Sequence, residues 1–391
     1  MKSNILTLFK TFFLILLFTN VGADEPRFYI PESPPIAAKS YILMDHNSGK
    51  VLAAENENER RSPASLTKIM TSYVVFKRLK EDFISLDDEG KISEKAWKTG
   101  GSRSFIEVGK MINLEDLLKG MIIQSGNDAS VAIAEYVGGT EDGFVDLMNS
   151  YAGALGMKNT YFRNSTGLPD DEHLTSSRDL AILTTNFMTN YPDIYALFKE
   201  KEFEYGGITG NKYNRNKLLW RDESSDGVKT GYTSSAGYCL IGSAKRGSMR
   251  LITVVAGSDS ANNSFADTQR LLEYGFRFYA TQKYFDANKE YTIAKIWGGK
   301  EDNISLGVDK DISVTLPRTN FKDIKVNYNV KNNVQAPIKK GDVLGSLEIV
   351  SKNEVVLTSD LIALNDVDAK GFFGRLWSKF ILWIMSLFGM V

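Results

Sequence analysis

Residues 62–74 read SPASLTKIMTSYV, which predicts the start of a helix that carries a possible nucleophile. Ser62 is suited to cap this helix and Pro63 to occupy its first turn. The apolar residues recur at helical spacing, at Leu66, Ile69, Met70, Tyr73, Val74 and Leu79. Ser65 falls in the first turn, so Lys68 is expected on the same helix face and within reach of it.

A serine and a lysine at this spacing have the chemistry of a nucleophile beside a base. The positive end of the helix favours an oxyanion near Ser65 and disfavours the protonated form of Lys68. A capped amphipathic helix with a solvent-facing lysine has the same pattern, so the tetrapeptide alone does not establish catalysis. No other serine of the chain has a lysine three residues later.

Strand patterns lie on both sides of a helical centre. Tyr41–Met44 and Val51–Ala54 flank the turn sequence DHNSGK and predict a hairpin, and residues 237–243 and 249–256 predict a second one. Between them, Asn113 is suited to cap a helix over 114–123, and another helix is expected over about 129–136. The pattern indicates an α+β domain whose sheet is assembled from both ends, with an α-helical insert.

The C-terminal third predicts a separate unit and a tail. Residues 288–366 are β-branched and turn-rich, which indicates a small β domain. In 371–391, Arg375, Ser378, Lys379 and Ser386 fall on one narrow helical face and leave a broad apolar arc with tryptophans. We expect a helix that lies in the plane of a membrane surface; docking on the protein's own core is the alternative.

The N-terminus predicts export. Lys2 and Lys10 surround an apolar stretch that strengthens over 12–18, and Val21-Gly22-Ala23 precedes Asp24. These features are typical of a signal peptide cleaved after Ala23. The apolar part is shorter than the ~20 residues that a membrane span requires, which disfavours the alternative of an N-terminal anchor.

Composition excludes several function classes. The 391 residues hold 47 Lys plus Arg against 48 Asp plus Glu, without the basic excess that favours nucleic acid. Cys239 is the only cysteine, so no intramolecular disulfide can form, and with two histidines, His46 and His173, a zinc site is improbable. We therefore expect neither a metal nor another cofactor.

Two further motifs gain meaning from their order. Ser125-Gly126-Asn127 lies between two predicted helices, and Lys229-Thr230-Gly231 precedes the late hairpin. Each is weak alone, because S-x-N recurs at Ser260 and Ser351 and a second Lys-Thr-Gly occupies 98–100, where we expect a structural role. Together, S-x-x-K, S-x-N and K-T-G in this order form the signature of penicillin-recognising serine hydrolases.

With NRNKLLW at 214–220 and DGVKTGYT at 226–233, the chain closely resembles the low-molecular-mass penicillin-binding proteins, specifically the D-alanyl-D-alanine carboxypeptidases. The resemblance runs from Pro35 to the C-terminus. It implies a penicillin-binding/β-lactamase-like domain, a small all-β domain and a C-terminal amphipathic helix. We expect the signal peptide at 1–23, the peptidase domain at 24–285, the β domain at 286–368 and the anchor helix at 369–391.

The resemblance implies a role for each motif residue. Ser65 would attack the carbonyl of the penultimate D-alanine, Lys68 would accept its proton, and Ser125 would relay a proton to the departing D-alanine. The backbone N–H groups of Ser65 and Tyr232 would form the oxyanion hole. The substrate-binding residues implied in this way are Asn127, Lys229, Thr230, Gly231, Tyr232, Arg215 and His173.

Two departures from the family pattern bear on substrate preference. Many relatives have histidine directly after K-T-G, where this chain has Tyr232. Some relatives have an arginine in the turn after the late strand pair, where this chain reads SDSANNS at 258–264. Recognition of the substrate carboxylate is therefore expected to be reduced or rerouted.

The implied partners are peptidoglycan peptides ending in D-Ala-D-Ala, β-lactams and, through the C-terminal helix, the periplasmic face of the inner membrane, with roles in peptidoglycan maturation and cell shape. A β-lactamase is disfavoured because no E-x-x-L-N string occurs, and a Ser-His-Asp hydrolase because no G-x-S-x-G occurs. A wall-binding protein that acylates poorly, and endopeptidase rather than strict carboxypeptidase activity, remain open alternatives.

Overall fold

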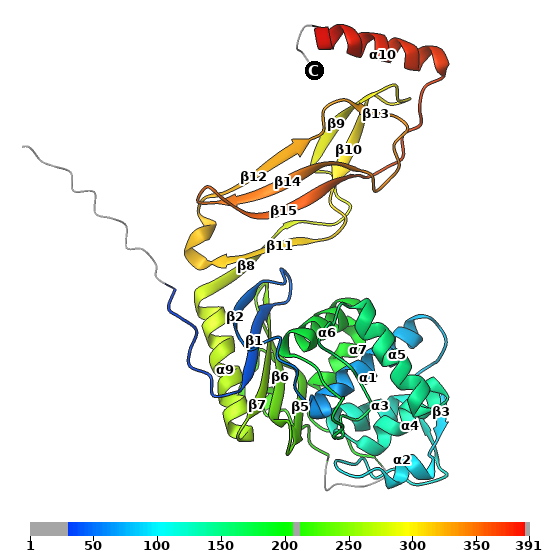
Figure 1. The fold of residues 1–391 in the computed structure, drawn as a ribbon, viewed down its shortest axis with the longest axis vertical. Helices are drawn as coiled ribbons and strands as arrows, with labels where there is room; N and C mark the ends of the chain where they lie inside the picture. Colours follow the sequence, from blue (N-terminus) through cyan, green and yellow to red (C-terminus); the bar gives the residue numbers. More distant parts are fainter. Residues whose placement is uncertain (1–29, 206–211, 388–391) are drawn as a thin grey trace, which may run out of the picture. The chain divides into compact units, whose positions relative to one another are not determined.

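The computed structural model describes residues 30–205 and 212–387 (Figure 1). The expected signal peptide at 1–23 lies outside these residues. None of the described helices is long and apolar enough to cross a membrane.

Both ends of the first domain contribute to one antiparallel sheet, as the two hairpin patterns predict. Its strand order is β2-β1-β7-β6-β5, and the β1–β7 pairing places Ile42 opposite Val254. The strands are β1 Ser40–Asp45, β2 Val51–Glu55, β5 Ser225–Thr233, β6 Gly237–Arg246 and β7 Met249–Ser258. β5, which carries Lys229-Thr230-Gly231, is therefore an edge strand of this sheet and packs on the 3₁₀ turn at 64–67.

Helices cover both faces of this sheet. α9 packs on β6 and β7, and α6 packs on β1 and β7, on the opposite face (Figure 1). The helices are α1 Lys68–Lys80, α2 Glu94–Lys98, α3 Leu114–Ile123, α4 Asn127–Gly138, α5 Glu141–Ala154, α6 Ser177–Asn190, α7 Pro192–Tyr195, α8 Leu218–Arg221 and α9 Ala261–Phe278. The prediction for Asn113 is confirmed, because its side chain accepts a hydrogen bond from the backbone N–H of Asp116 at the start of α3.

The start of the nucleophile helix differs from the prediction. Ser65 lies in a 3₁₀ turn, η1 (Ala64–Thr67), whose N-cap is Pro63 and has no side-chain cap bond, so the expected cap by Ser62 is wrong. α1 begins only at Lys68. In a 3₁₀ turn, residues three apart eclipse each other, so this tighter geometry still brings Ser65 and Lys68 together.

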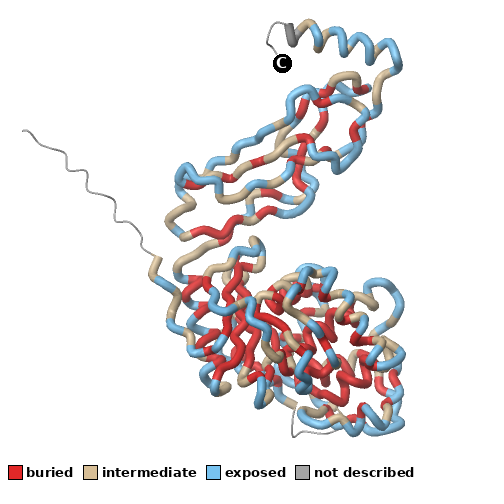
Figure 2. The backbone as a smooth tube through the Cα atoms, in the orientation of Figure 1, coloured by how far each residue is buried: buried red, intermediate tan, exposed pale blue. Residues whose placement is uncertain are grey.

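α1 is buried on all sides over its first nine residues, from Lys68 to Phe76 (Figure 2). Its neighbours include α4, α5 and α6. Lys68 is only 1% exposed. The alternative of a surface helix with a solvent-facing lysine is therefore excluded, and the cost of burying an amine must be met by its surroundings.

The C-terminal part forms its own β structure with its own core. β8 (Tyr279–Phe285) pairs with β11 (Ile312–Pro317), and a six-stranded sheet has the order β12-β14-β15-β10-β9-β13. The fully buried side chains of this core include Leu306, Leu347, Ile349 and Leu361. The remaining elements are β9 Thr292–Trp297, β10 Asn303–Gly307, η3 Arg318–Phe321, β12 Ile324–Val330, β13 Val334–Gln335, β14 Val343–Ser351, β15 Glu354–Ala363 and α10 Phe372–Leu387.

Candidate active site

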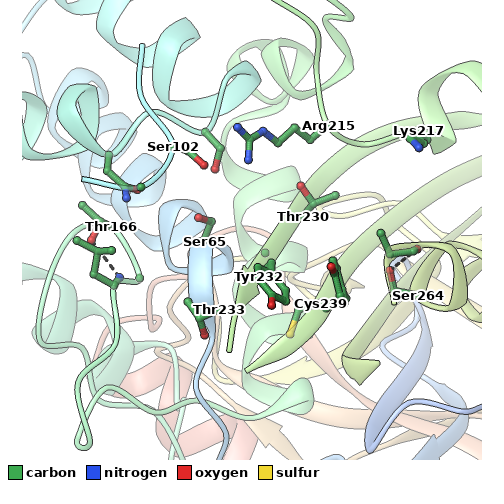
Figure 3. Close-up of a pocket in the computed structure, with 18 of the residues that line it drawn as sticks. Ser65, Ser102, Thr166, Arg215, Lys217, Thr230, Tyr232, Thr233, Cys239 and Ser264 are labelled. Atoms are coloured by element: carbon green, nitrogen blue, oxygen red, sulfur yellow. Dashed lines mark hydrogen bonds between the residues drawn. The ribbon is translucent and has the colours of Figure 1, made fainter. Parts of the chain in front are cut away.

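The three motifs meet at one cavity of about 600 Å³ between β5, η1 and the α3–α4 connection (Figure 3). The predicted site residues that line it are Ser65, Ser125, Asn127, Arg215, Thr230, Gly231 and Tyr232. Lys68 and Lys229 lie behind this lining, 1% and 3% exposed. His173 does not line the cavity.

Lys68 is held by three acceptors, one of which is the hydroxyl of Ser65. Its Nζ lies 3.2 Å from Oγ of Ser65, 2.7 Å from Oδ1 of Asn127 and 2.7 Å from the carbonyl oxygen of Thr166. The acceptors fix the amine beside the hydroxyl at hydrogen-bond distance, which is the geometry required of a general base.

The electrostatics of the site favour a neutral Lys68. Burial is the largest cause that holds its pKa well below the usual value of 10.5, followed by the positive charges of Lys229 and Arg215. Lys229 is itself buried, and burial together with Arg215 lowers its pKa to about 7. Burial and the neighbouring positive charges thus lower the pKa of both lysines, and a neutral Lys68 has a lone pair for the Ser65 proton.

The α3–α4 connection positions the second motif. Ser125 has a positive φ of 61° and lines the cavity, and Asn127 begins α4 and donates through Nδ2 to the carbonyl of Gly100 at 2.7 Å. The next residue, Asp128, is fully buried and accepts hydrogen bonds from the backbone of Ser104 and Phe105. These bonds tie the loop at 100–106 to the S-x-N turn, so that both face the cavity together.

The second K-T-G tripeptide is structural, as expected. Lys98 is the last residue of α2 and pairs with Glu94, Thr99 is the C-cap of α2, and Gly100 provides the carbonyl that holds Asn127. It does not line the cavity.

Strand β5 forms the opposite wall, and Gly231 allows it to approach the nucleophile. A Cβ at Gly231 would lie 3.2 Å from both the backbone nitrogen of Ser65 and the carbonyl oxygen of Pro63, tighter than ordinary contact. The absence of a side chain at Gly231 therefore lets β5 lie directly against the turn that carries Ser65. The Tyr232 ring is 56% exposed and packs on Tyr238, with 4.3 Å between the ring centroids.

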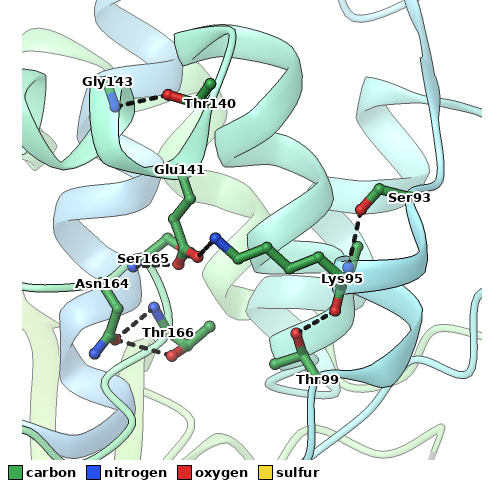
Figure 4. A network of polar contacts seen from close by, with 10 residues as sticks. Ser93, Lys95, Thr99, Thr140, Glu141, Gly143, Asn164, Ser165 and Thr166 are labelled. Atoms are coloured by element: carbon green, nitrogen blue, oxygen red, sulfur yellow. Dashed lines mark hydrogen bonds and ion pairs between the residues drawn. The ribbon is translucent and has the colours of Figure 1, made fainter.

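A polar network supports the loop that holds Lys68 (Figure 4). Glu141, largely buried, accepts from the backbone N–H of Ser165 at 3.1 Å and its Oγ at 2.8 Å, and pairs with Lys95 at 2.8 Å. Asn164 Oδ1 accepts from the backbone N–H of Thr166 at 3.2 Å and from its Oγ1 at 2.9 Å. The network fixes the carbonyl of Thr166 on which the position of Lys68 depends.

His173 lies behind the nucleophile turn instead of bordering the cavity. Its Nδ1 accepts from the backbone N–H of Arg163 at 3.2 Å, so Nε2 carries the proton and donates to Oγ1 of Thr67 at 2.9 Å. Burial lowers its pKa to about 4, which keeps the ring neutral in this role. The structure thus places His173 as a support of the turn carrying Ser65.

The sequence motifs did not point to four residues that build or support the site. Thr166 acts through its backbone carbonyl, for which no residue type is required, so the sequence has no signal for it. Glu141 and Asp128 act through folding contacts, although Asp128 follows S-x-N directly. Lys217 lines the cavity and stands two positions after Arg215, so its place next to a predicted site residue was the one available sequence signal. Among the described residues, no cluster of three or more His, Cys, Asp or Glu could hold a metal ion.

Comparison with known families assigns both parts of the chain. The family described as D-alanyl-D-alanine carboxypeptidase matches residues 28–260, and the family described as penicillin-binding protein 5, C-terminal domain, matches residues 279–369. The second match begins where β8 begins, seven residues before the boundary expected from sequence.

Individual relatives match over most of the chain. D-alanyl-D-alanine carboxypeptidase DacA of Escherichia coli is 40% identical over 368 residues, covering 92% of this chain and 91% of the relative. DacF of Bacillus subtilis is 38% identical, covering 88% and 90%. The crystal structure of penicillin-binding protein 5 from Haemophilus influenzae superposes with a TM-score of 0.82 at 38% identity, covering 86% of this chain and 99% of the other.

Proposed function

Because the chain belongs to the D-alanyl-D-alanine carboxypeptidase family, we propose that it removes the terminal D-alanine of peptidoglycan peptides through an acyl-enzyme on Ser65. It is a serine-type hydrolase of the penicillin-binding group. The observation that carries the residue assignment is the 3.2 Å approach of Lys68 Nζ to Ser65 Oγ inside the cavity that all three motifs build.

This geometry supports the following route to acylation. Neutral Lys68 takes the proton of Ser65, whose oxygen attacks the carbonyl carbon of the penultimate D-alanine, and the backbone N–H groups of Ser65 and Tyr232 stabilise the oxyanion. As the carbon–nitrogen bond breaks, Ser125 donates its proton to the departing D-alanine nitrogen and recovers one from Lys68. The product is an ester on Ser65 and free D-alanine.

Water then attacks the ester and gives up its proton to the Lys68–Ser125 pair. The pair passes this proton to Oγ of Ser65 as the ester bond breaks, which releases the shortened peptide and restores the serine. A β-lactam enters the same first step, because opening its ring by Ser65 forms the same kind of ester. Its amine leaving group remains attached to the acyl part and cannot diffuse away, which supports β-lactams as inhibitors.

Two cationic residues and a hydroxyl support recognition of a C-terminal carboxylate. Arg215 and Thr230 line the cavity, and Lys229 lies directly behind Thr230 on β5. Arginine and lysine next to a hydroxyl are favourable partners of a carboxylate. These residues support a position of the leaving D-alanine on the β5 side of Ser65.

The test is release of D-alanine by the purified full chain in detergent. We expect release from an acyl-L-Lys-D-Ala-D-Ala peptide by the wild type and by a Ser62→Ala control, and none by Ser65→Ala. A fluorescent penicillin should likewise label the wild type and Ser62→Ala but not Ser65→Ala. Full release by Ser65→Ala, or none by a folded wild type, contradicts the proposal.

We further propose that the enzyme is exported and that α10 attaches it to a membrane surface. Six large apolar side chains of α10 are between 48% and 83% exposed: Phe372, Phe373, Leu376, Trp377, Phe380 and Trp383. An exposed aromatic face beside Arg375 and Lys379 suits the boundary between headgroups and acyl chains.

Membrane attachment is tested by sedimentation of the full chain with vesicles of anionic and zwitterionic phospholipid. A variant with Trp377→Ser, Phe380→Ser and Trp383→Ser should remain in the supernatant while releasing D-alanine at the wild-type rate. Equal sedimentation of both proteins contradicts the role of α10.

A further inference from the structure

The segment before β5 alternates between buried and exposed residues. Asn214, Asn216 and Leu218 are buried, whereas Arg215 and Lys217 are exposed and line the cavity. The chain bends at Arg215 and turns at Lys217, whose backbone is helical (φ −65°, ψ −12°) as the N-cap of α8, and both side chains line the cavity from these separate positions.

Hydrogen bonds fix this alternation. Nδ2 of Asn214 donates to the carbonyl of Glu200 at 3.0 Å, and Oδ1 of Asn214 accepts from the backbone of Asn216 at 2.9 Å. Leu218 packs in a small core with Leu240 and Phe265, which attaches the segment to β6 and α9. The side chain of Lys217 therefore starts from a fixed backbone position at the cavity rim.

Arg215 and Lys217 cover different parts of the cavity. In Figure 3, Arg215 extends toward Ser102, and Lys217 lies on the other side of Thr230, above Ser264. The wall on the Lys217 side consists of Ala261, Ser264 and Phe265 from α9. No ion pair of Lys217 occurs among the described residues, and none of the cavity's lining residues there is Asp or Glu. A substrate carboxylate bound at Thr230 would therefore lie between Arg215 on one side and Lys217 on the other.

We propose that Lys217 is a specificity-determining residue that binds the carboxylate of the leaving D-amino acid from the α9 side. This inference rests on the proposed function. Residues 258–264 contain no arginine or lysine, and Lys217 supplies a positive charge on this side of the cavity. Because Lys217 is exposed at the cavity rim, its effect is expected on substrate binding and not on the chemical step.

The experiment compares two substrates that share an acyl part and differ in the leaving group. Acyl-D-alanyl-D-lactate carries the carboxylate, and the acyl-D-alanine methyl ester does not. Lys217→Gln should lower kcat/KM for the first by about 3–10-fold through KM, as for one solvent-exposed charge pair, and leave the methyl ester unchanged. Lys217→Arg should restore most of the loss, and high salt should diminish it.

A matched control is Lys158→Gln, which removes the same charge at an exposed position outside the cavity. It should leave both substrates unchanged. Equal losses for the two substrates, or no loss for the carboxylate substrate, overturns the role of Lys217 while the proposed function stands. Failure of the folded wild type to cleave either substrate overturns both.

Discussion

Nζ of Lys68 lies 3.2 Å from Oγ of Ser65, and the lysine is fully enclosed by the protein. The pair combines a nucleophile in a 3₁₀ turn with an amine at the start of a buried helix. Burial does more than position this amine, because it also lowers its pKa and so supplies the lone pair that a base requires.

Lys68→Arg should abolish acylation as completely as Lys68→Met. Arginine keeps the positive charge but does not deprotonate in proteins, so it cannot accept the Ser65 proton. We expect the rate of fluorescent-penicillin labelling to fall by about 10²–10⁴-fold in both variants, the range of general-base catalysis. Substantial labelling of the arginine variant would show that Lys68 acts as a charge instead of a base.

Gly231→Ala should impair acylation more than it impairs folding. The added Cβ would meet the backbone of Pro63 and Ser65 at 3.2 Å, so β5 must move away from the nucleophile turn. Loss of one oxyanion donor costs about 10²–10³-fold in kcat. The check is kcat beside the thermal midpoint. The control is Gly153→Ala in α5, where the added Cβ meets no atom within 4 Å. It should leave kcat unchanged and should not lower the thermal midpoint, because alanine is a better helix former than glycine.

Glu141→Gln should reduce acylation although Glu141 does not line the cavity. The charge that binds Ser165 and pairs with Lys95 would be lost, and the loop that presents the Thr166 carbonyl to Lys68 would be held less firmly. We expect a loss of stability of about 1–3 kcal/mol, as for a buried hydrogen bond to a charged group, and slower penicillin labelling.

Lys95→Gln is the matched variant for Glu141, since the Lys95 side chain is 57% exposed and leaves the Glu141–Ser165 bonds intact. Its effect should be well below that of Glu141→Gln. If Lys95→Gln is equally damaging, the ion pair and not the Ser165 contact supports the loop.

Stability should rise with pH above neutrality because of Lys229. Its pKa is about 7 in the folded protein and 10.5 when unperturbed, so between these values the unfolded chain binds more protons. The cost of burying the charge is complete below pH 7 and is relieved as the pH increases. From pH 7 to 9 the wild type should gain on the order of 1–2 kcal/mol over Lys229→Met.

The measurement is urea unfolding of both proteins followed by near-ultraviolet circular dichroism, with Lys158→Met as the control that retains the wild-type slope. Parallel pH dependence of wild type and Lys229→Met would mean that Lys229 is charged in the folded state at neutral pH.

The sequence determined the features that depend on local spacing. The order of the three motifs predicted a site that the structure assembles at one cavity, the alternation of residues 237–256 predicted the late hairpin, and Asn113 predicted the start of α3. These features follow from side-chain periodicity and from hydrogen bonds within a few residues, which are properties of short segments.

Only the tertiary structure decided what the segments do to each other. The Thr166 carbonyl holds Lys68, Glu141 holds the loop that contains Thr166, and His173 supports the turn that carries Ser65. All three residues are distant from Ser65 in the sequence. The pKa of Lys68 is lowered by enclosure and by the charges of Arg215 and Lys229, which the fold alone brings near. Desolvation and Coulomb interaction depend on distance in space, so no local pattern of residues encodes their magnitude.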